Sequence, residues 1–244
     1  MDPEEHVEFY DVISDPRKRL AHEGGFLKWL LETAPGGRVL DMACGTGVQA
    51  EFLARNGALV TARDIDDRMI DRAREERAHE RITYEVHDMR EPSGGPFDLA
   101  IVMGNSISLA GGYDGAARAL CAMSAMLSPR GAGFVQVVNY AALRAGGARH
   151  KVARKKTRGG EIVIVKDMVP AEGAGALVSF AYFSRKNQEW QTSGSQSALP
   201  DLSAGGLGEI VRSAGLLVEA QFGDYDRSPY DEDRSPDLLL VLRK

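Results

Sequence analysis

Val39-Leu40-Asp41-Met42-Ala43-Cys44-Gly45-Thr46-Gly47 is the stretch that decides the fold of this 244-residue chain. An apolar strand pattern ends at Asp41 and turns through Gly45-Thr46-Gly47 into a helical pattern, and Asp64 ends the next strand pattern. Glycines allow a tight turn and a close approach of the backbone to a ligand. A glycine turn with acids at two strand ends predicts a site for a ligand that contains a nucleoside.

Two cofactor classes fit this turn. Residues 45–50 satisfy the G-x-G-x-x-G/A fingerprint, and Asp64 follows Gly45 by 19 residues, which indicates NAD. A pyrophosphate, however, favours bare N–H groups at a helix N-terminus, and a carboxylate at Asp41 would repel it. The same carboxylate suits the ammonium and the sulfonium of S-adenosylmethionine, and Asp64 suits its ribose diol. We therefore favour S-adenosylmethionine, because a turn that serves only helix packing would not need both acids.

Length and composition bound the possible partners. A chain of 244 residues with 43% hydrophobic and 27% charged residues is typical of a globular α/β domain with a modest insertion. The net charge of −5 argues against bulk nucleic acid. Cys44 and Cys121 form neither a disulfide framework nor a metal-ligand spacing. No apolar run approaches the ~18 residues of a membrane span, so we expect a cytoplasmic protein without a metal or a membrane partner.

Strand and helix patterns alternate along most of the chain. Residues 7–33 have apolar residues at helical spacing, broken at Asp15-Pro16, and predict an N-terminal helical cap. The remaining patterns predict strands at 38–41, 59–64, 83–87, 97–103, 133–138, 216–222 and 238–242, and helices at 47–56, 68–77, 115–127 and 207–213. Alternation of this kind predicts an α/β fold with a mostly parallel sheet, which binds ligands at the carboxyl ends of its strands.

The pattern changes between residues 143 and 199. Residues 161–169, 176–183 and 188–195 are rich in β-branched and aromatic residues, with a polar turn at Arg185-Lys186-Asn187, and predict antiparallel strands. We expect residues 143–199 to form a small β-rich lid, inserted into a core made of residues 1–142 and 200–244.

Two features of this insertion leave alternatives open. Tyr182, Phe183 and Trp190 either line an acceptor pocket, pack on the core or form a subunit contact, so a homo-oligomer is one expectation. The basic run RHKVARKK at 149–156 attracts an acidic substrate, contacts RNA or forms a solvated surface, and we favour the solvated surface.

Three motifs carry a resemblance to a known family. They are VLDMACGTG at 39–47, VTARDIDDRMIDRA at 60–73 and FDLAIVMGNSISL at 97–109. With them the chain resembles a class I, Rossmann-like S-adenosylmethionine-dependent methyltransferase, and within that superfamily it is most similar to the glycine N-methyltransferase-like group. The resemblance covers about residues 10–140 and the last helix and two strands. It implies a seven-stranded, mostly parallel sheet with an antiparallel last strand.

The resemblance also implies a set of cofactor-binding residues. The backbone of Ala43, Gly45 and Gly47 would contact the methionyl part, oriented by Asp41, and Arg19 would pair with its carboxylate. An arginine suits a carboxylate because its fork binds both oxygens, although a solvated helix charge explains Arg19 equally well. The ribose and adenine would be held by Asp64, Ile65, Asp88 and Met89, and the pocket beside the sulfonium would be closed by Met103 and Gly104.

One departure from the family concerns the methyl acceptor. In glycine-methylating relatives an arginine before an Asn-Tyr pair holds the substrate carboxylate, whereas here Val138 precedes Asn139-Tyr140. We therefore expect a small-molecule acceptor other than glycine, methylated at an amine nitrogen or, next, at an oxygen. The candidate acceptor ligands are Asn105, Ser106, Ser108, Asn139 and Tyr140. Asn105 serves equally well as a cap of the following turn.

The candidate catalytic residues are Asn105, Tyr140 and His87, with His150 as a further base, although His87 at a strand end is more often a structural residue. Methyl transfer is an in-line displacement, for which alignment of the reactants supplies most of the acceleration. A cofactor-binding regulator without catalysis, and an NAD-linked oxidoreductase, are the alternative functions.

Overall fold

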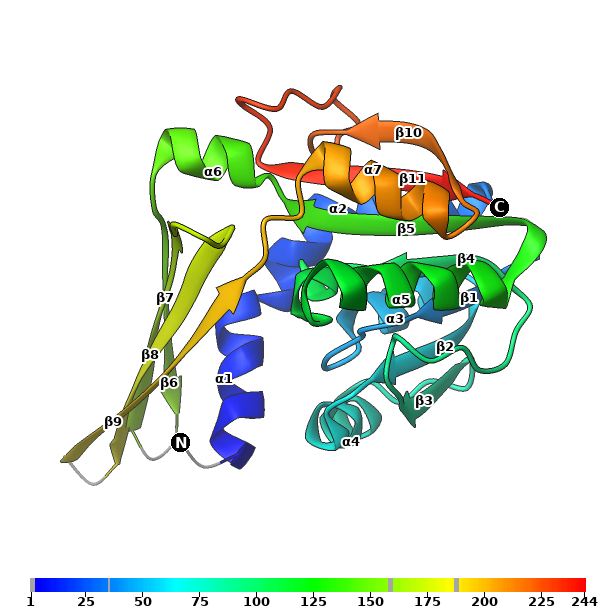
Figure 1. The fold of residues 1–244 in the computed structure, drawn as a ribbon. Helices are drawn as coiled ribbons and strands as arrows, with labels where there is room; N and C mark the ends of the chain where they lie inside the picture. The colour runs from blue at the N-terminus through cyan, green and yellow to red at the C-terminus, as the bar shows by residue number, and fades with distance from the viewer. Residues whose placement is uncertain (1–2, 35, 158–159, 187–188) are drawn as a thin grey trace.

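The computed structural model describes residues 3–34, 36–157, 160–186 and 189–244. Its centre is a seven-stranded sheet with the strand order β10-β11-β5-β4-β1-β2-β3 (Figure 1). The strands of this sheet are β1 (Arg38–Asp41), β2 (Leu59–Asp64), β3 (Ile82–Val86), β4 (Phe97–Val102), β5 (Leu127–Val138), β10 (Leu217–Phe222) and β11 (Asp237–Arg243). They match the seven predicted strands, with the largest difference at β5, which begins earlier than predicted.

The pairing directions confirm the predicted fold class. Val39 of β1 lies beside Val60 of β2 and Leu99 of β4, both in parallel register. Only β11 opposes its neighbours in this sheet, pairing antiparallel with β5 and β10. The carboxyl ends of β1 to β5 therefore meet at one edge, where an open α/β sheet binds its ligands.

The helices of the described residues are α1 (Pro3–Ser14), α2 (Pro16–Glu32), α3 (Val48–Arg55), α4 (Asp67–Glu76), α5 (Gly112–Met126), α6 (Tyr140–Gly146) and α7 (Ala204–Ser213), with a 3₁₀ turn, η1, at Ser106–Leu109. Helices α2 to α5 and α7 cover the two faces of the seven-stranded sheet. Val39 packs with α2, α3 and α4 on one face, and its neighbour Leu40 packs with α5 and α7 on the other. Both faces of β1 are buried, which explains its unbroken apolar run.

The predicted N-terminal cap is a pair of helices, with the break at Asp15-Pro16 where the sequence placed it. Asp15 separates α1 from α2 in a left-handed conformation, and its side chain accepts from Lys18 N at 3.3 Å. Pro16 begins α2, where the missing N–H costs nothing. Within the described residues, no helix combines the length and apolar character that a membrane crossing requires.

A separate antiparallel sheet contains four strands in the order β6-β7-β8-β9. They are β6 (Arg149–Thr157), β7 (Gly160–Pro170), β8 (Ala176–Lys186) and β9 (Glu189–Leu199). The sequence predicted three of them and missed β6, because its basic run resembled an exposed surface. Lysines are common on an edge strand, where they discourage pairing with another chain. Asn187 of the predicted polar turn lies outside the described residues, and the division into core and lid stays a prediction.

Helix α1 lies between the two sheets (Figure 1). Its residues Phe9 and Ile13 pack with Ile164 and Tyr182 in a third apolar cluster, and the rings of Phe9 and Tyr182 stack at 5.1 Å between centroids. Of the aromatic side chains on the second sheet, Tyr182 therefore packs on α1, whereas Trp190 is half exposed. This helix couples the second sheet to the strand ends of the first.

Candidate functional site

The glycine turn after β1 has the conformation that its sequence predicts. Gly45 and Gly47 have φ angles of +54° and +84°, in the left-handed region that favours glycine. Gly45 N donates to Asp64 Oδ2 at 2.8 Å, so the turn is tied to the end of β2. Asp41 and Asp64 therefore lie on either side of one loop, as expected from the strand ends.

Helix α1 holds the outer side of this turn. Thr46 Oγ1 donates to Asp11 Oδ1 at 2.6 Å, and Arg77 Nη1 donates to Thr46 O at 2.8 Å. Arg77 Nη2 also lies 3.2 Å from Asp11 Oδ2. Charge-assisted bonds of this kind fix the loop before any ligand arrives. The sequence carries no local signal for Asp11, because its partners are 35 and 66 residues away.

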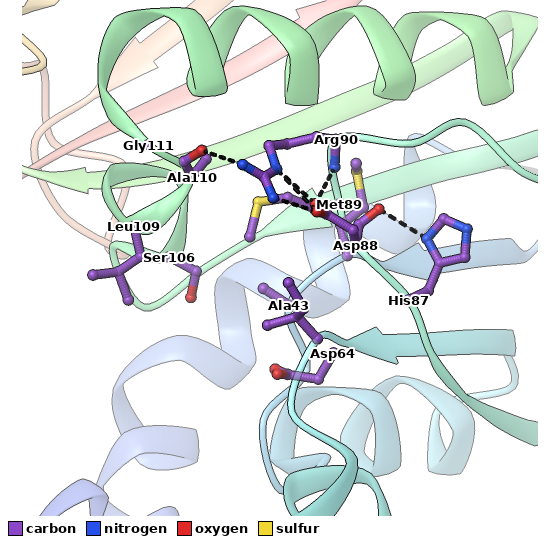
Figure 2. A pocket seen from close by; sticks show the side chains of 12 residues that line it. Ala43, Asp64, His87, Asp88, Met89, Arg90, Ser106, Leu109, Ala110 and Gly111 are labelled. Atoms are coloured by element: carbon purple, nitrogen blue, oxygen red, sulfur yellow. Dashed lines mark hydrogen bonds and ion pairs between the residues drawn. The ribbon is translucent and has the colours of Figure 1, made fainter.

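A cavity of about 210 Å³ opens at the carboxyl ends of β1, β2 and β3 (Figure 2). Ile65 and Leu109 line it and are 64% and 66% exposed, although most large apolar side chains of the chain are buried. Exposed apolar side chains lining one cavity indicate an apolar ligand surface. Ile65 was a predicted site residue, whereas Leu109 was missed although it ends the third motif.

Two carboxylates give this cavity a polar side. Asp64 Oδ1 accepts from Asp66 N at 3.0 Å, and burial raises the pKa of this carboxyl despite the backbone donors. Asp88 forms an ion pair with Arg90, whose guanidinium lowers the pKa of Asp88. Arg90 Nη1 also donates to Ala110 O at 3.3 Å, so it joins Asp88 to the opposite wall (Figure 2). The sequence analysis did not identify Arg90.

A second cavity, of about 480 Å³, lies between the strand ends, helices α1 and α2, and the antiparallel sheet. Its lining includes Arg19, Glu23, Gly104, Asn105, Lys166 and Phe180. Arg19 Nε donates to Glu23 Oε1 at 2.9 Å, and Gln49 Nε2 donates to Glu23 Oε2 at 2.7 Å. This network holds the Arg19 guanidinium beside Gly104, where a side chain would meet Arg19 Nη2 at 3.2 Å.

Asp41 is the most buried acid of the site, with 2% of its surface exposed. Burial raises its pKa to about 7, while the Ala43 backbone bond and Arg19 oppose the rise. The charged form of a buried carboxyl is stabilised by a nearby cation. A cation placed beside Asp41 would therefore favour its charged form.

Comparison with known proteins indicates the family of the chain. A model of the methyltransferase domain matches residues 39–131. A cypemycin N-terminal methyltransferase from a Streptomyces species is 27% identical over 242 residues, which cover 98% of this chain and 95% of that protein. The matched domain and this relative support a class I S-adenosylmethionine-dependent methyltransferase. Its cofactor is S-adenosylmethionine, which confirms the prediction made from the two strand-end acids.

Two further relatives extend the similarity. A rabbit (Oryctolagus cuniculus) glycine N-methyltransferase is 36% identical over 110 residues, which span 39% of this chain and only 37% of that enzyme. The sugar N-methyltransferase KedS8 from Streptoalloteichus sp ATCC 53650 shares the fold with a TM-score of 0.79 and 20% identity, over 96% of this chain and 93% of that one. None of these relatives supports the NAD-linked alternative.

The methyltransferase site brings most of the predicted cofactor residues to the two cavities. Ala43, Asp64, Ile65, Asp88 and Met89 line the smaller one, and Arg19 and Gly104 line the larger one. Asp41, Gly45, Gly47 and Met103 line neither cavity, and Met103 is 3% exposed and packs in the core beneath the strand end. The role of each residue toward the cofactor stays a prediction.

The predicted acceptor residues are placed less favourably. Asn105 Nδ2 donates to Tyr140 Oη, Tyr140 Oη donates to Ser108 Oγ, and Ser108 Oγ donates to Asn105 Oδ1, each at 3.1 Å. All three residues are buried, and Asn105 Oδ1 also accepts from Val138 N at 2.9 Å. Their polar groups satisfy one another, and of the three only Asn105 lines the larger cavity.

The other predicted acceptor and base residues also lie outside the larger cavity. Asn139 caps α6 and donates to the carbonyls of Glu232 and Ser235 at 2.8 and 2.9 Å. Ser106 and His87 line the smaller cavity, and His87 Nδ1 lies 2.8 Å from Asp88 O. His150 pairs with Asp167 on the exposed face of the second sheet. The structure thus gives Asn139 a capping role and separates His87 from the larger cavity.

We expect Tyr140→Phe to lower the free energy of unfolding by about 1–2 kcal/mol, because it leaves the buried Asn105 Nδ2 without its acceptor and removes the bond donated to Ser108 Oγ. The turnover of methyl transfer should change only a few-fold, since Tyr140 does not line the larger cavity. Urea unfolding and steady-state kinetics measure the two effects. A large loss of turnover with unchanged stability would restore Tyr140 as a catalytic residue.

Proposed function

We propose that the enzyme transfers a methyl group from S-adenosylmethionine to an amine nitrogen of a small-molecule acceptor held in the larger cavity. The observation that carries this proposal is the loop at 104–106. Gly104 and Asn105 line the larger cavity, and Ser106, the next residue, lines the smaller one. A ligand with its nucleoside in the smaller cavity would therefore reach the boundary of the larger one beside Gly104.

The chain's own residues fit S-adenosylmethionine. Ile65 and Leu109 offer apolar contacts to a flat base, and Asp64 and Asp88 offer acceptors for hydroxyl and amino groups. Asp41, buried behind the glycine turn, favours a cation, and Arg19 beside Gly104 suits the cofactor carboxylate. Bound S-adenosylmethionine supplies an electrophilic methyl group on a positively charged sulfur.

Positioning is the main catalytic contribution that these residues make. Gly104 has no side chain, and its φ of +71° would strain any other residue there, so the loop leaves room for two ligands to meet. Alignment of a nucleophile with the bond to be broken contributes up to about 7–11 kcal/mol. The Arg19–Glu23–Gln49 network supports this alignment because it fixes the floor of the larger cavity.

An amine suits this cavity better than a hydroxyl group. A hydroxyl needs a protein base to take its proton, whereas a neutral amine forms by proton loss to water. Among the described residues, the carboxyl groups that line the larger cavity are Glu23 and Asp237. Glu23 accepts hydrogen bonds from Arg19 and Gln49, and Asp237 forms a hydrogen bond with Gln136. The names of the Streptomyces, rabbit and KedS8 relatives also describe transfer to nitrogen or to an N-terminus.

The proposal is tested by incubating the enzyme with S-adenosylmethionine and matched pairs of acceptors, each an amine and its hydroxyl isostere. Amino sugars and short peptides with a free N-terminus are the first amines to use. We expect S-adenosylhomocysteine to form with an amine and not with its isostere, and mass spectrometry to find one added methyl group on nitrogen. Methylation of the hydroxyl member alone would contradict the proposed acceptor atom.

A further inference from the structure

Two lysines of the second sheet face each other at the wall of the larger cavity. Lys151 of β6 and Lys166 of β7 are direct cross-strand partners, and both line the cavity. Directly opposed residues of an antiparallel pair point to the same face, and like charges in this position destabilise a sheet. The basic run that the sequence analysis assigned to a solvated surface thus contributes one residue to the cavity.

The charge of this pair is not balanced by the protein. Within the described part of the chain, neither lysine forms an ion pair with a carboxylate, and Lys166 Nζ lies over the Phe180 ring at 5.5 Å from its centroid. Burial lowers the pKa of both lysines, and the positive charge of Arg19 adds to this effect. The shifts agree with a site where positive charge has accumulated.

The acids near the pair are engaged elsewhere. Asp15, which attracts Lys151, caps α2 and pairs with Lys18 at 3.4 Å. Glu23 is held by Arg19 and Gln49, and Asp237 interacts with Arg149 and Gln136. An anion that enters the cavity would be attracted to the lysines without displacing an existing ion pair.

We propose that Lys151 and Lys166 bind an anionic group of the methyl acceptor, a carboxylate or a phosphate. This inference rests on the proposed function, and it defines the acceptor as an amine that carries a negative charge at its other end. The amine would point to Gly104 and the anionic group to Lys151 and Lys166, which line the same cavity. An ammonium is a compact point charge that suits either anion.

Calorimetric titration tests this proposal with three probes: inorganic phosphate, pyrophosphate and succinate. The titrations use the whole enzyme saturated with S-adenosylhomocysteine, and the probes separate a phosphate site from a carboxylate site. We expect one probe to bind, with at least a tenfold loss of affinity in Lys151→Gln and in Lys166→Gln. Lys156→Gln is the matched control, because Lys156 is exposed on the opposite face of β6 and does not line the cavity.

The outcomes distinguish the proposed anion site from the proposed methyl transfer on which it rests. Absence of binding by all three probes, or binding that neither lining substitution weakens, would overturn the anion site while cofactor binding remains intact. Failure of S-adenosylhomocysteine to bind would instead count against the proposed function. Lys151 is the more exposed of the pair, so its variant keeps the test valid should Lys166→Gln fail to fold. In the absence of an anion, Lys151→Gln should also raise the unfolding midpoint, because it removes the opposed charge.

Discussion

Asp64→Ala is expected to weaken S-adenosylmethionine binding by about 1–3 kcal/mol, the cost of removing a charge-assisted partner. This corresponds to a rise in Kd of about 5- to 150-fold. Asp64 lines the smaller cavity and would lose both the ribose contact and the bond from Gly45 N. Isothermal titration calorimetry at constant pH measures the change.

The matched control for this prediction is Asp67→Ala. Asp67 lies three residues after Asp64, and its side chain is 76% exposed. The Asp67→Ala substitution therefore removes an equal charge at a position outside the cavity. We expect its Kd to remain that of the unmodified enzyme. An Asp64→Ala variant that binds S-adenosylmethionine as tightly as Asp67→Ala would refute the ribose assignment.

Gly47→Ala is expected to lower the free energy of unfolding by about 2–5 kcal/mol, since left-handed strain and overpacking add together. The φ of Gly47 is +84°, and a Cβ there would lie 2.6 Å from Tyr84 Oη. Tyr84 is buried, and its hydroxyl donates to Arg77 O at 3.0 Å, so it cannot move away without loss of a bond. Urea unfolding at neutral pH measures this change.

Gly57→Ala provides the control for backbone strain alone. Gly57 has a φ of +100°, but a Cβ at this position meets nothing within 4 Å. We expect Gly57→Ala to be clearly less destabilising than Gly47→Ala, and Tyr84→Phe to relieve part of the effect of Gly47→Ala in the double variant. Equal destabilisation by the two alanine substitutions would show that contact with Tyr84 contributes nothing.

The strand segments and the acids at their ends could be predicted from the sequence alone. Asp41, Asp64 and Asp88 each follow an apolar strand pattern, and parallel strands bring their carboxyl ends to one edge whatever the details of packing. The choice of S-adenosylmethionine over NAD also came from a local feature, because the single carboxylate of Asp41 would repel a pyrophosphate and attract a sulfonium. These parts of the fold and site depend on short-range patterns.

Contacts between distant segments depended on packing that no local pattern encodes. Asn105, Ser108 and Tyr140 are polar residues near the strand ends, but only the structure shows that they bond to one another. Leu109 became part of the smaller cavity because η1 turns it toward the end of β2, as its place in the cavity lining with Ile65 shows.

The sequence by itself determined the α/β core, the glycine turn and the negative charge around the cofactor, because strand periodicity, turn geometry and charge are properties of neighbouring residues. Only the tertiary structure decided which polar groups remain available to an acceptor. Cross-strand register set Lys151 against Lys166, and the docking of α1 between the two sheets enclosed the cavity they share with Arg19. Register and docking are set by burial over the whole chain, so they could not be read from any one segment.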